Sequence, residues 1–315
     1  MDKYQLSIII PHYNIPRLLE KLLNSIPRSD DIQVIVVDDN STQNIDELTA
    51  VVEAHDFVEF YTNHTKKNSL GTCRNIGLDH ALGKWVLFAD ADDYYTEGWI
   101  DEISAYFDSD IDMLFFSATS INLDTGKVDT RHLMYRDKIQ AYQLNPNKET
   151  ELLLRYDFAS ACLKMYRRSF LSCNNIRFLQ IVTAEDTLFS LECGGKAEKI
   201  ACTNFPVYCI TRRGGSLTTV QTKEYTDLRI KISIKRYAYL YRILDDKELT
   251  FLGIENAGIQ TLYRAIADKM GFKRVVEYAR LLRAEGVPII NRKHANPFTL
   301  FRRFLKSVIG RLRRR

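Results

Sequence analysis

The chain has 315 residues, of which 45% are hydrophobic and 27% charged, and its formal net charge is +4. This composition is typical of a folded globular protein and excludes a disordered chain, a collagen-like repeat and a small disulfide-stabilised scaffold. No apolar run approaches the roughly 18 residues that span a bilayer, and the N-terminus shows no secretory signal pattern.

The first 120 residues alternate between short apolar runs and amphipathic stretches. The apolar runs predict strands over Gln5–Ile10 (ended by Pro11), Gln33–Val37, Val58–Tyr61, Lys84–Ala89 and Met113–Ser117. The amphipathic stretches predict helices over Ile15–Ile26, Ile45–Ala54 and Gly71–Leu82. Strands that alternate with helices and are apolar throughout indicate a parallel sheet covered on both faces.

Polar side chains follow three of these strands, directly after Ile10, Val37 and Ala89. The carboxyl ends of parallel strands lie at one edge of the sheet, and ligands bind in the crevice outside that edge. We therefore expect the three polar clusters to surround a single crevice.

The pattern changes beyond about Asp124. Residues 124–146 are polar and are expected to form an irregular excursion over the site, and residues 147–215 are expected to mix helices with short strands. From about Thr222 the chain is predicted to be nearly all helical, with amphipathic stretches around 226–243, 254–269 and 272–284.

The basic residues are concentrated at the C-terminus. Residues 302–315 hold seven Lys or Arg residues and no acid, so the rest of the chain has a net charge of −3. The tail also carries apolar residues at helical spacing, namely Phe301, Phe304, Leu305, Val308, Ile309 and Leu312. This pattern is typical of a helix on an anionic membrane surface, and the alternative is a helix docked on the core. The acidic remainder argues against a nucleic-acid partner.

Six cysteines are scattered along the chain and form no CxxC pair. They predict reduced, mostly buried thiols in a cytoplasmic protein. A metal site built from them is not expected, because no local pair of ligands could nucleate it.

The strongest chemical signal is the run Asp90-Ala91-Asp92-Asp93 after a buried strand. Carboxylates at i and i+2 of a turn can face one divalent cation together, and Mg²⁺ and Mn²⁺ prefer such oxygen ligands. Acidic turns are common without metal, but three carboxylates in four residues repel one another unless a positive charge neutralises them. A haloacid-dehalogenase site fits less well, because Tyr94 and Tyr95 follow the run. Neither GxGxxG nor GxxxxGK[ST] is present.

Four sequence motifs within the first 93 residues are characteristic in their order and spacing: SIIIPHYN from Ser7, VVDDNST from Val36, the stretch from Asn68 to Gly77, and the stretch from Gly83 to Asp93. Together they resemble the family 2 glycosyltransferases of the GT-A fold, with a weaker continuation to about residue 218. The resemblance implies an α/β GT-A nucleotide-diphospho-sugar transferase fold, a mostly parallel sheet flanked by helices, as the catalytic domain over 1–220. A helical C-terminal region over 221–296 and a basic amphipathic tail over 297–315 are expected to follow.

For the donor, the resemblance implies that Pro11, Tyr13 and Asp39 hold the base, with the Asp39 carboxylate accepting the uracil N–H. Asp39 could equally cap the following helix. Arg74 is expected to reach the uracil, the ribose or a phosphate, with a surface ion pair as the alternative. His12 and Asn68 lie in the same motifs and are grouped with the donor-binding residues, and no catalytic role is assigned to His12.

For the metal, the resemblance implies Mn²⁺ or Mg²⁺ bound by Asp92 and by Asp90, which also faces the ribose. Such a cation would offset the charge that grows on the departing diphosphate. Family sites often add a downstream His, but this chain has Arg212 and Arg213 there, so the third protein ligand is left open. An arginine could contact the pyrophosphate instead, and Ser216 is a further candidate contact.

The acidic pair Glu185-Asp186 opens a helix-like stretch, where such pairs often only complement the helix dipole. With the upstream motifs, the resemblance implies that Asp186 is the general base for the acceptor hydroxyl. One base opposite a leaving diphosphate implies a single displacement with inversion. Glu185 would support the acceptor or orient Asp186, and Lys164 would line the acceptor pocket or only pack in its strand.

These features predict an inverting, metal-dependent glycosyltransferase that moves a sugar from a UDP-sugar donor to a saccharide or lipid-linked acceptor in cell-surface polysaccharide synthesis. The tail would hold the enzyme at the cytoplasmic face of the membrane. A sugar-1-phosphate nucleotidyltransferase is one alternative, but the segment PHYNIPRLLEK contains no glycine for its phosphate loop. A non-catalytic nucleotide-sugar or membrane adaptor is another, and the intact Asp90, Asp92 and Asp186 argue against it.

Overall fold

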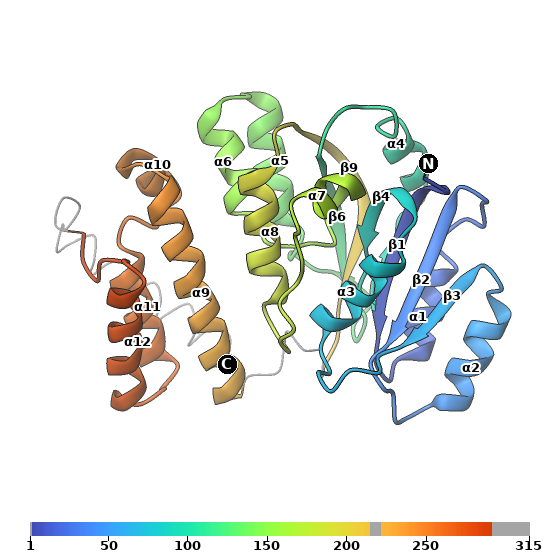
Figure 1. Ribbon diagram of the computed structural model, residues 1–315, viewed down its shortest axis with the longest axis horizontal. Helices are drawn as coiled ribbons and strands as arrows, with labels where there is room; N and C mark the ends of the chain where they lie inside the picture. Colours follow the sequence, from blue (N-terminus) through green and yellow to red (C-terminus); the bar gives the residue numbers. More distant parts are fainter. Residues whose placement is uncertain (1, 215–221, 292–315) are drawn as a thin grey trace. The chain divides into compact units, whose positions relative to one another are not determined.

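The computed structural model describes residues 2–214 and 222–291. The chain divides into two compact units, residues 1–219 and 220–315. Ser216 and the basic tail over 297–315 lie outside the described residues. The first unit is a sheet with helices packed on both of its faces (Figure 1).

The sheet of the first unit has the strand order β3-β2-β1-β4-β8-β6-β9-β5, and β7 pairs with β6. The strands are β1 (Tyr4–His12), β2 (Ile32–Asp38), β3 (Val58–Thr62), β4 (Gly83–Phe88), β5 (Tyr94–Tyr95), β6 (Met113–Asn122), β7 (Lys127–Val128), β8 (Lys164–Arg167) and β9 (Ile200–Arg212). The β3-β2-β1-β4 part is parallel, as expected. The whole sheet is mixed, because β8, β5 and β7 run antiparallel to their neighbours. The α/β architecture is confirmed.

The helices of the first unit connect or cover these strands. They are α1 (Pro16–Leu23), α2 (Ile45–Ala54), α3 (Leu70–His80), α4 (Trp99–Ser104), α5 (Leu133–Leu144), α6 (Lys148–Tyr156), α7 (Arg168–Cys173) and α8 (Glu185–Lys196). The right-handed crossover rule places α1 and α2 on one face and α3 on the other, because the chain reverses its direction across the sheet after β3. α3 lies close to β1 because Gly77 has no side chain; a Cβ there would be 2.3 Å from Ile9 Cγ2.

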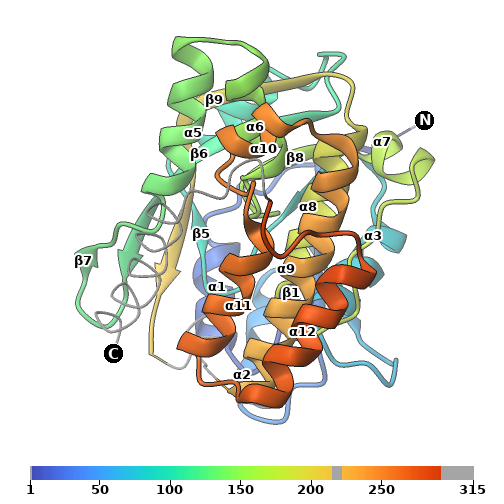
Figure 2. The same ribbon diagram turned by 90° about the vertical axis from the view of Figure 1, so that its left-hand side faces the viewer.

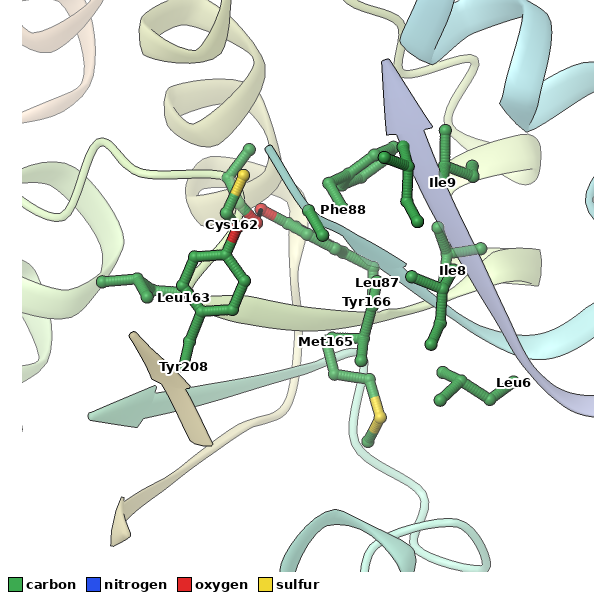
Figure 3. Close-up of a cluster of buried hydrophobic side chains, with 14 of the residues drawn as sticks. Leu6, Ile8, Ile9, Leu87, Phe88, Cys162, Leu163, Met165, Tyr166 and Tyr208 are labelled. Atoms are coloured by element: carbon green, nitrogen blue, oxygen red, sulfur yellow. Dashed lines mark hydrogen bonds between the residues drawn. The ribbon is translucent and has the colours of Figure 1, made fainter. Parts of the chain in front are cut away.

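The core of the first unit is built on the central strands. All seven residues of β2 are buried, which explains its unbroken apolar run. Figure 3 shows Leu6 and Ile8 of β1, Phe88 of β4 and Tyr166 of β8 within one cluster. Burying each such side chain stabilises the folded state by about 2 kcal/mol. The core therefore holds the strands in place, and with them the strand ends that the polar clusters follow. All six cysteines are free, and four of them are buried.

The structure corrects the expectation that Pro11 ends the first strand. β1 continues to His12, and Pro11 pairs with Val37 of β2. Alternate residues of a strand direct their backbone groups to opposite neighbours. The backbone groups of Ile9 point to β4, so those of Pro11 point to the same side. Pro11 lies beyond the last β1–β4 pair, which joins Ile9 and Phe88. The missing N–H of Pro11 therefore costs no ladder hydrogen bond.

The structure also corrects the expectation that residues 124–146 are irregular. α5 occupies most of the second half of this segment. Ile139 is fully buried, and Tyr135 and Tyr142 pack against the core beside it. These three residues have the i, i+4, i+7 spacing of one helix face, but two of them are tyrosines in a polar context, which hides the pattern.

The second unit is helical. Its helices are α9 (Lys223–Ile243), α10 (Asp246–Phe251), α11 (Ala257–Ala267) and α12 (Phe272–Ala284). Figure 2 shows α9, α11 and α12 side by side, and they share a core that includes Ile230, Ile234, Ala265, Tyr278 and Leu282. The three expected helical stretches are confirmed, whereas α10 was not expected. Within the described parts of the chain, no helix has the length and apolar character needed to cross a membrane.

Candidate active site

The loops after β1 and β2 are fastened to each other. Asn14 adopts a left-handed conformation with φ of 58°, and its Oδ1 accepts hydrogen bonds from the backbone N–H groups of Thr42 and Gln43. The Asn14 N–H in turn donates to Ser41 Oγ at 2.9 Å. These bonds bring Tyr13 and the residues after Asp38 to the same edge of the sheet.

His12 is a buried support beneath these loops. Its side chain is 1% exposed, and its Nε2 accepts a hydrogen bond from the Ile15 N–H at 3.2 Å. The proton is therefore on Nδ1, which donates to Asp38 Oδ1 at 2.8 Å. Burial raises the pKa of Asp38, but hydrogen bonds from His12 and Ser41 outweigh it, so the net pKa lies below the usual value. Both ring nitrogens of His12 thus face protein groups.

Tyr13, Asp39 and Asn68 form one wall at the carboxyl edge of the sheet, where the loops after β1 and β2 meet. Asp39 Oδ1 accepts a hydrogen bond from Asn63 Nδ2 at 2.7 Å, and burial raises the pKa of Asp39. The helix-capping alternative for Asp39 is wrong, because α2 begins after Asn44. Tyr13 is 50% exposed, and Asn68 is exposed near the Asp39 backbone. The wall therefore offers an open aromatic ring, a carboxylate and an amide.

Arg74 joins the acidic run to the start of α8. The side chain projects from α3, is nearly fully buried, and forms two ion pairs of 2.6 Å, Nη2 with Asp90 Oδ1 and Nη1 with Glu185 Oε1. α3 can come this close because Gly71 has no Cβ; one there would be 2.0 Å from Leu179 O. The surface ion-pair alternative is therefore wrong. Glu185 is also buried and turned inward to Arg74.

The acidic run is clamped by β9. Thr211 donates its backbone N–H to Asp93 Oδ1 and its hydroxyl to the Asp92 carbonyl, both at 2.6 Å. The Asp90 N–H donates to the Tyr208 hydroxyl at 2.8 Å. Asp93 is buried by these contacts, whereas the Asp90 and Asp92 side chains stay partly exposed. The i and i+2 carboxylates, unlike that of Asp93, thus remain accessible at this edge of the sheet.

The carboxylates Asp90 and Asp92 fit a divalent cation of the Mg²⁺ or Mn²⁺ type. Burial and the charge of Asp90 raise the pKa of Asp92, so negative charge is crowded here. Among residues 2–214 and 222–291, no group of three or more His, Cys, Asp or Glu side chains is placed to hold a metal ion. Mg²⁺ commonly binds through one or two carboxylates together with substrate phosphates and water. Two carboxylates would therefore be enough protein ligands for such a cation.

Arg212, the last residue of β9, and Arg213, which follows it, point to different places. Arg213 Nε lies 3.6 Å from Asp92 Oδ2, whereas Arg212 Nη1 lies 3.4 Å from Asp129 Oδ2. Arg131, which the sequence analysis did not identify, donates from Nη1 to the Thr211 carbonyl at 3.4 Å and lowers the pKa of Asp92. Arg213 and Arg131 therefore add positive charge beside the acidic run. The only sequence signal for Arg131 was its place in the polar segment expected over the site.

Asp186 lies in the first turn of α8, directly after Glu185. Burial and the charge of Glu185 raise the pKa of Asp186 to about 7, while Arg74 acts in the opposite direction. Tyr135 of α5 is close by: burial and the charge of Asp186 raise the pKa of Tyr135 to about 12. A carboxyl group with a pKa near the working pH is suited to general base catalysis.

The Lys164 side chain is not open to a pocket. It is 1% exposed, and its Nζ donates to the carbonyls of Phe158 and Ser160 and to Ser190 Oγ, at 2.6, 2.9 and 3.0 Å. An ammonium group has three N–H donors, and all three are used by the protein. The structure therefore places Lys164 inside the fold, unlike the expected lining of an acceptor pocket.

Comparison with known families identifies the chain. Residues 7–174, just over half of its length, match the family model described as Glycosyl transferase family 2. The chain belongs to this family. The matched region contains Arg74 and the whole acidic run, and it ends before Glu185 and Asp186.

Among curated relatives, a poly(ribitol-phosphate) beta-N-acetylglucosaminyltransferase, TarS of Staphylococcus aureus, is 28% identical over 219 residues. The match covers 66% of this chain and 36% of TarS, so this chain spans about a third of that relative's length. Among solved structures, residues 1–349 of S. aureus TarS with UDP-GlcNAc superpose with a TM-score of 0.58 at 18% identity, covering 90% of this chain and 92% of the other.

A mannosyltransferase of Pyrobaculum calidifontis, solved with GDP-Man and Mn²⁺, superposes with a TM-score of 0.55 at 16% identity and covers 98% of this chain and 87% of the other. At these identities the structural matches show a shared fold. Together with the family match, they establish the GT-A type of architecture for the chain.

Proposed function

We propose that this chain is an inverting glycosyltransferase that moves a sugar from a UDP-sugar to the hydroxyl group of a glycan acceptor. The observation that carries this function is the double ion pair of Arg74. One guanidinium group holds Asp90 of the acidic run and Glu185 at the start of α8, each at 2.6 Å. It thereby keeps the carboxylates of the acidic run, which would bind the cation, and Asp186 at one site.

The donor nucleotide is held at the wall of Tyr13, Asp39 and Asn68. The open ring of Tyr13 offers a stacking surface, and the Asp39 carboxylate is an acceptor for the uracil N–H. UDP as the nucleotide is supported by the UDP-GlcNAc found in the TarS structure. Pro11 and His12 shape this wall from within β1 rather than by exposed polar atoms.

The diphosphate is held at Asp90 and Asp92, which would bind Mn²⁺ or Mg²⁺. When bound, such a cation supplies positive charge that stabilises the leaving diphosphate. Arg213 lies beside Asp92 and can form charge-assisted hydrogen bonds with phosphate oxygens, and Arg131 adds charge on the same side. Arg212 faces Asp129 and is left out of this set.

Asp186 is the general base. Its carboxylate takes the proton from the acceptor hydroxyl as the hydroxyl oxygen forms a bond to the anomeric carbon, and the bond from that carbon to the diphosphate oxygen breaks. The proton ends on Asp186 and the electron pair on the leaving diphosphate. A single displacement of this kind inverts the anomeric configuration. Glu185, held by Arg74, orients the first turn of α8.

The acceptor is a saccharide or a lipid-linked glycan of cell-surface polymer synthesis. The poly(ribitol-phosphate) substrate in the name of TarS supports a polymeric surface acceptor. Residues 1–220 would perform the transfer, residues 221–296 would serve as an accessory region that contains α9–α12, and the basic tail over 297–315 would hold the protein on the cytoplasmic face of an anionic membrane. Family membership favours sugar transfer over the nucleotidyltransferase alternative.

A donor screen tests this function. The purified chain is incubated with a panel of nucleotide sugars in Mn²⁺, Mg²⁺ or EDTA, and released nucleoside diphosphate is measured. We expect cation-dependent release from one UDP-sugar, a loss of at least a hundredfold in Asp92→Asn, and full activity in the control Asp108→Asn, whose carboxylate is 99% exposed. Calorimetry that detects no UDP binding at all would contradict the proposal.

A further inference from the structure

A buried ammonium group is bound to α8 at Ser190, about one helical turn along the helix from the candidate base Asp186. Lys164 of β8 donates to Ser190 Oγ on α8 and to two carbonyls of the loop over residues 158–160. Ser190 Oγ itself donates to the Ala159 carbonyl at 2.6 Å. Residues i and i+4 of a helix share a face, so Asp186 and Ser190 lie on the same side of α8. Lys164 therefore fastens the face of α8 that carries Asp186.

The charge of Lys164 is not neutralised by its own contacts. Its three hydrogen-bond acceptors are two carbonyl oxygens and a hydroxyl, and the rings of Phe115 and Phe158 lie 5.5 and 5.1 Å from Nζ. Burial lowers the pKa of Lys164 to about 7, and Cys193 and then Asp186 act against this shift by favouring the ammonium form. Reciprocally, Lys164 favours the carboxylate form of Asp186.

Several other groups also act on the charge of Asp186. Glu185 and Asp90 both favour the protonated form of Asp186, and Tyr135 and Cys162 lie near it as neutral groups. Tyr166 of β8 is likewise neutral. Arg74 favours the carboxylate form, but its two terminal nitrogens are already paired with Asp90 and Glu185. Lys164 is a second cation, besides Arg74, that favours the carboxylate form of Asp186.

We propose that Lys164 is a positioning residue for the sugar-transfer reaction. It fixes α8 against the loop over residues 158–160 and favours the carboxylate form of Asp186, which the acceptor hydroxyl requires. This role rests on the proposed function of Asp186 as the general base. Lys164 acts through Asp186 and α8 and touches no substrate, since it is 1% exposed.

Two variants separate the charge from the hydrogen bond. Lys164→Met keeps a long side chain in the core but removes the charge, and Ser190→Ala removes the hydrogen bonds of Ser190 Oγ with Lys164 and Ala159 and keeps the charge. Loss of a nearby positive charge makes a carboxyl group harder to ionise. We expect the acid limb of the kcat profile of Lys164→Met to move about one unit to higher pH, with KM for the donor within twofold. Ser190→Ala should leave the midpoint of the acid limb of the kcat profile at the wild-type pH. A Lys164→Met profile with the wild-type midpoint would overturn the proposal.

A second measurement depends neither on the folding of Lys164→Met nor on activity. The chain is labelled with ¹³C-lysine, and the resonance that titrates near neutrality is followed in the wild type and in Asp186→Asn. Removing the Asp186 charge should lower the midpoint of that resonance by at least half a pH unit, and an unchanged midpoint would refute the pairing. Absence of donor turnover in the wild type would contradict the proposed function alone, because this titration involves no substrate.

Discussion

At the scale of single residues, Arg74 determines the arrangement of the site. It connects Asp90 with Glu185, which are far apart in the sequence, through two ion pairs, of which the one with Glu185 is almost fully shielded from water. A buried ion pair adds little net stability, but removing one partner leaves the other charge buried and unpaired. Arg74 is thus needed both for the fold and for the alignment of the carboxylates.

Arg74→Met should therefore destabilise the chain by about 3 kcal/mol, because it leaves the buried Glu185 carboxylate without a cation. Urea unfolding measures this loss. The matched control is Arg17→Met, which removes an ion pair of the same 2.6 Å length whose arginine is 85% exposed. The control should unfold like the wild type. Equal unfolding midpoints for Arg74→Met and the wild type would show that the ion pairs do not hold the site.

The raised pKa of Asp186 predicts a pH-dependent cost to stability. The folded pKa of about 7 lies above the ordinary 3.8, so the native state holds its proton more tightly than the unfolded state. The stability that the protonated form gives at low pH is lost as the pH rises from the ordinary pKa of 3.8 to the folded pKa of about 7. Asp186→Asn should therefore be more stable than the wild type by about 2 kcal/mol at pH 8, with a smaller gain at pH 5. Thermal unfolding at both pH values checks this, and a pH-independent difference would contradict it.

At the scale of elements, Arg74 is positioned by the close approach of α3 to the segment that precedes α8. The β3-β2-β1-β4 strands, α2 and α8 could be predicted from the sequence, because their apolar spacing is local. The acidic run and Asp186 could be recognised because each stands at the end of a strand or the start of a helix. The pairing of Arg74 with Glu185 could not, because it spans 111 residues. Arg131 was missed because α5, which follows it, presents tyrosines in place of aliphatic residues on its inner face.

Gly71→Ala tests this close approach. The added Cβ would be 2.0 Å from the Leu179 carbonyl oxygen, which is backbone and cannot rotate away. We expect a loss of about 2 kcal/mol in stability and a larger KM for the donor, because α3 must shift and carry Arg74 with it. Gly214→Ala is the control for stability, since a Cβ there meets no atom closer than 3.8 Å. Wild-type stability and KM in Gly71→Ala would show that the two segments can separate without cost.

At the scale of the whole molecule, charge is divided along the chain. The basic tail carries seven positive charges, and the remaining residues have a net charge of −3. A basic segment gains about 1 kcal/mol for each Lys or Arg near an anionic membrane surface. The proposed membrane attachment therefore depends on the tail and on salt.

Truncation after residue 296 should abolish sedimentation with vesicles that contain phosphatidylglycerol, while leaving donor turnover in solution unchanged. The full chain should lose its binding as salt is raised, because screening weakens surface attraction. Vesicles of phosphatidylcholine alone serve as the neutral control. Equal sedimentation of the truncated and full chains would assign membrane binding to another surface.

The most direct measurement of the central claim compares binding and turnover in Asp186→Asn. Asparagine keeps the shape of the side chain but cannot accept the proton of the acceptor hydroxyl. UDP affinity by calorimetry should stay within threefold of the wild type, while sugar transfer at saturating donor should fall by at least a thousandfold. Transfer that retains more than a tenth of the wild-type rate would contradict the assignment of Asp186 as the general base.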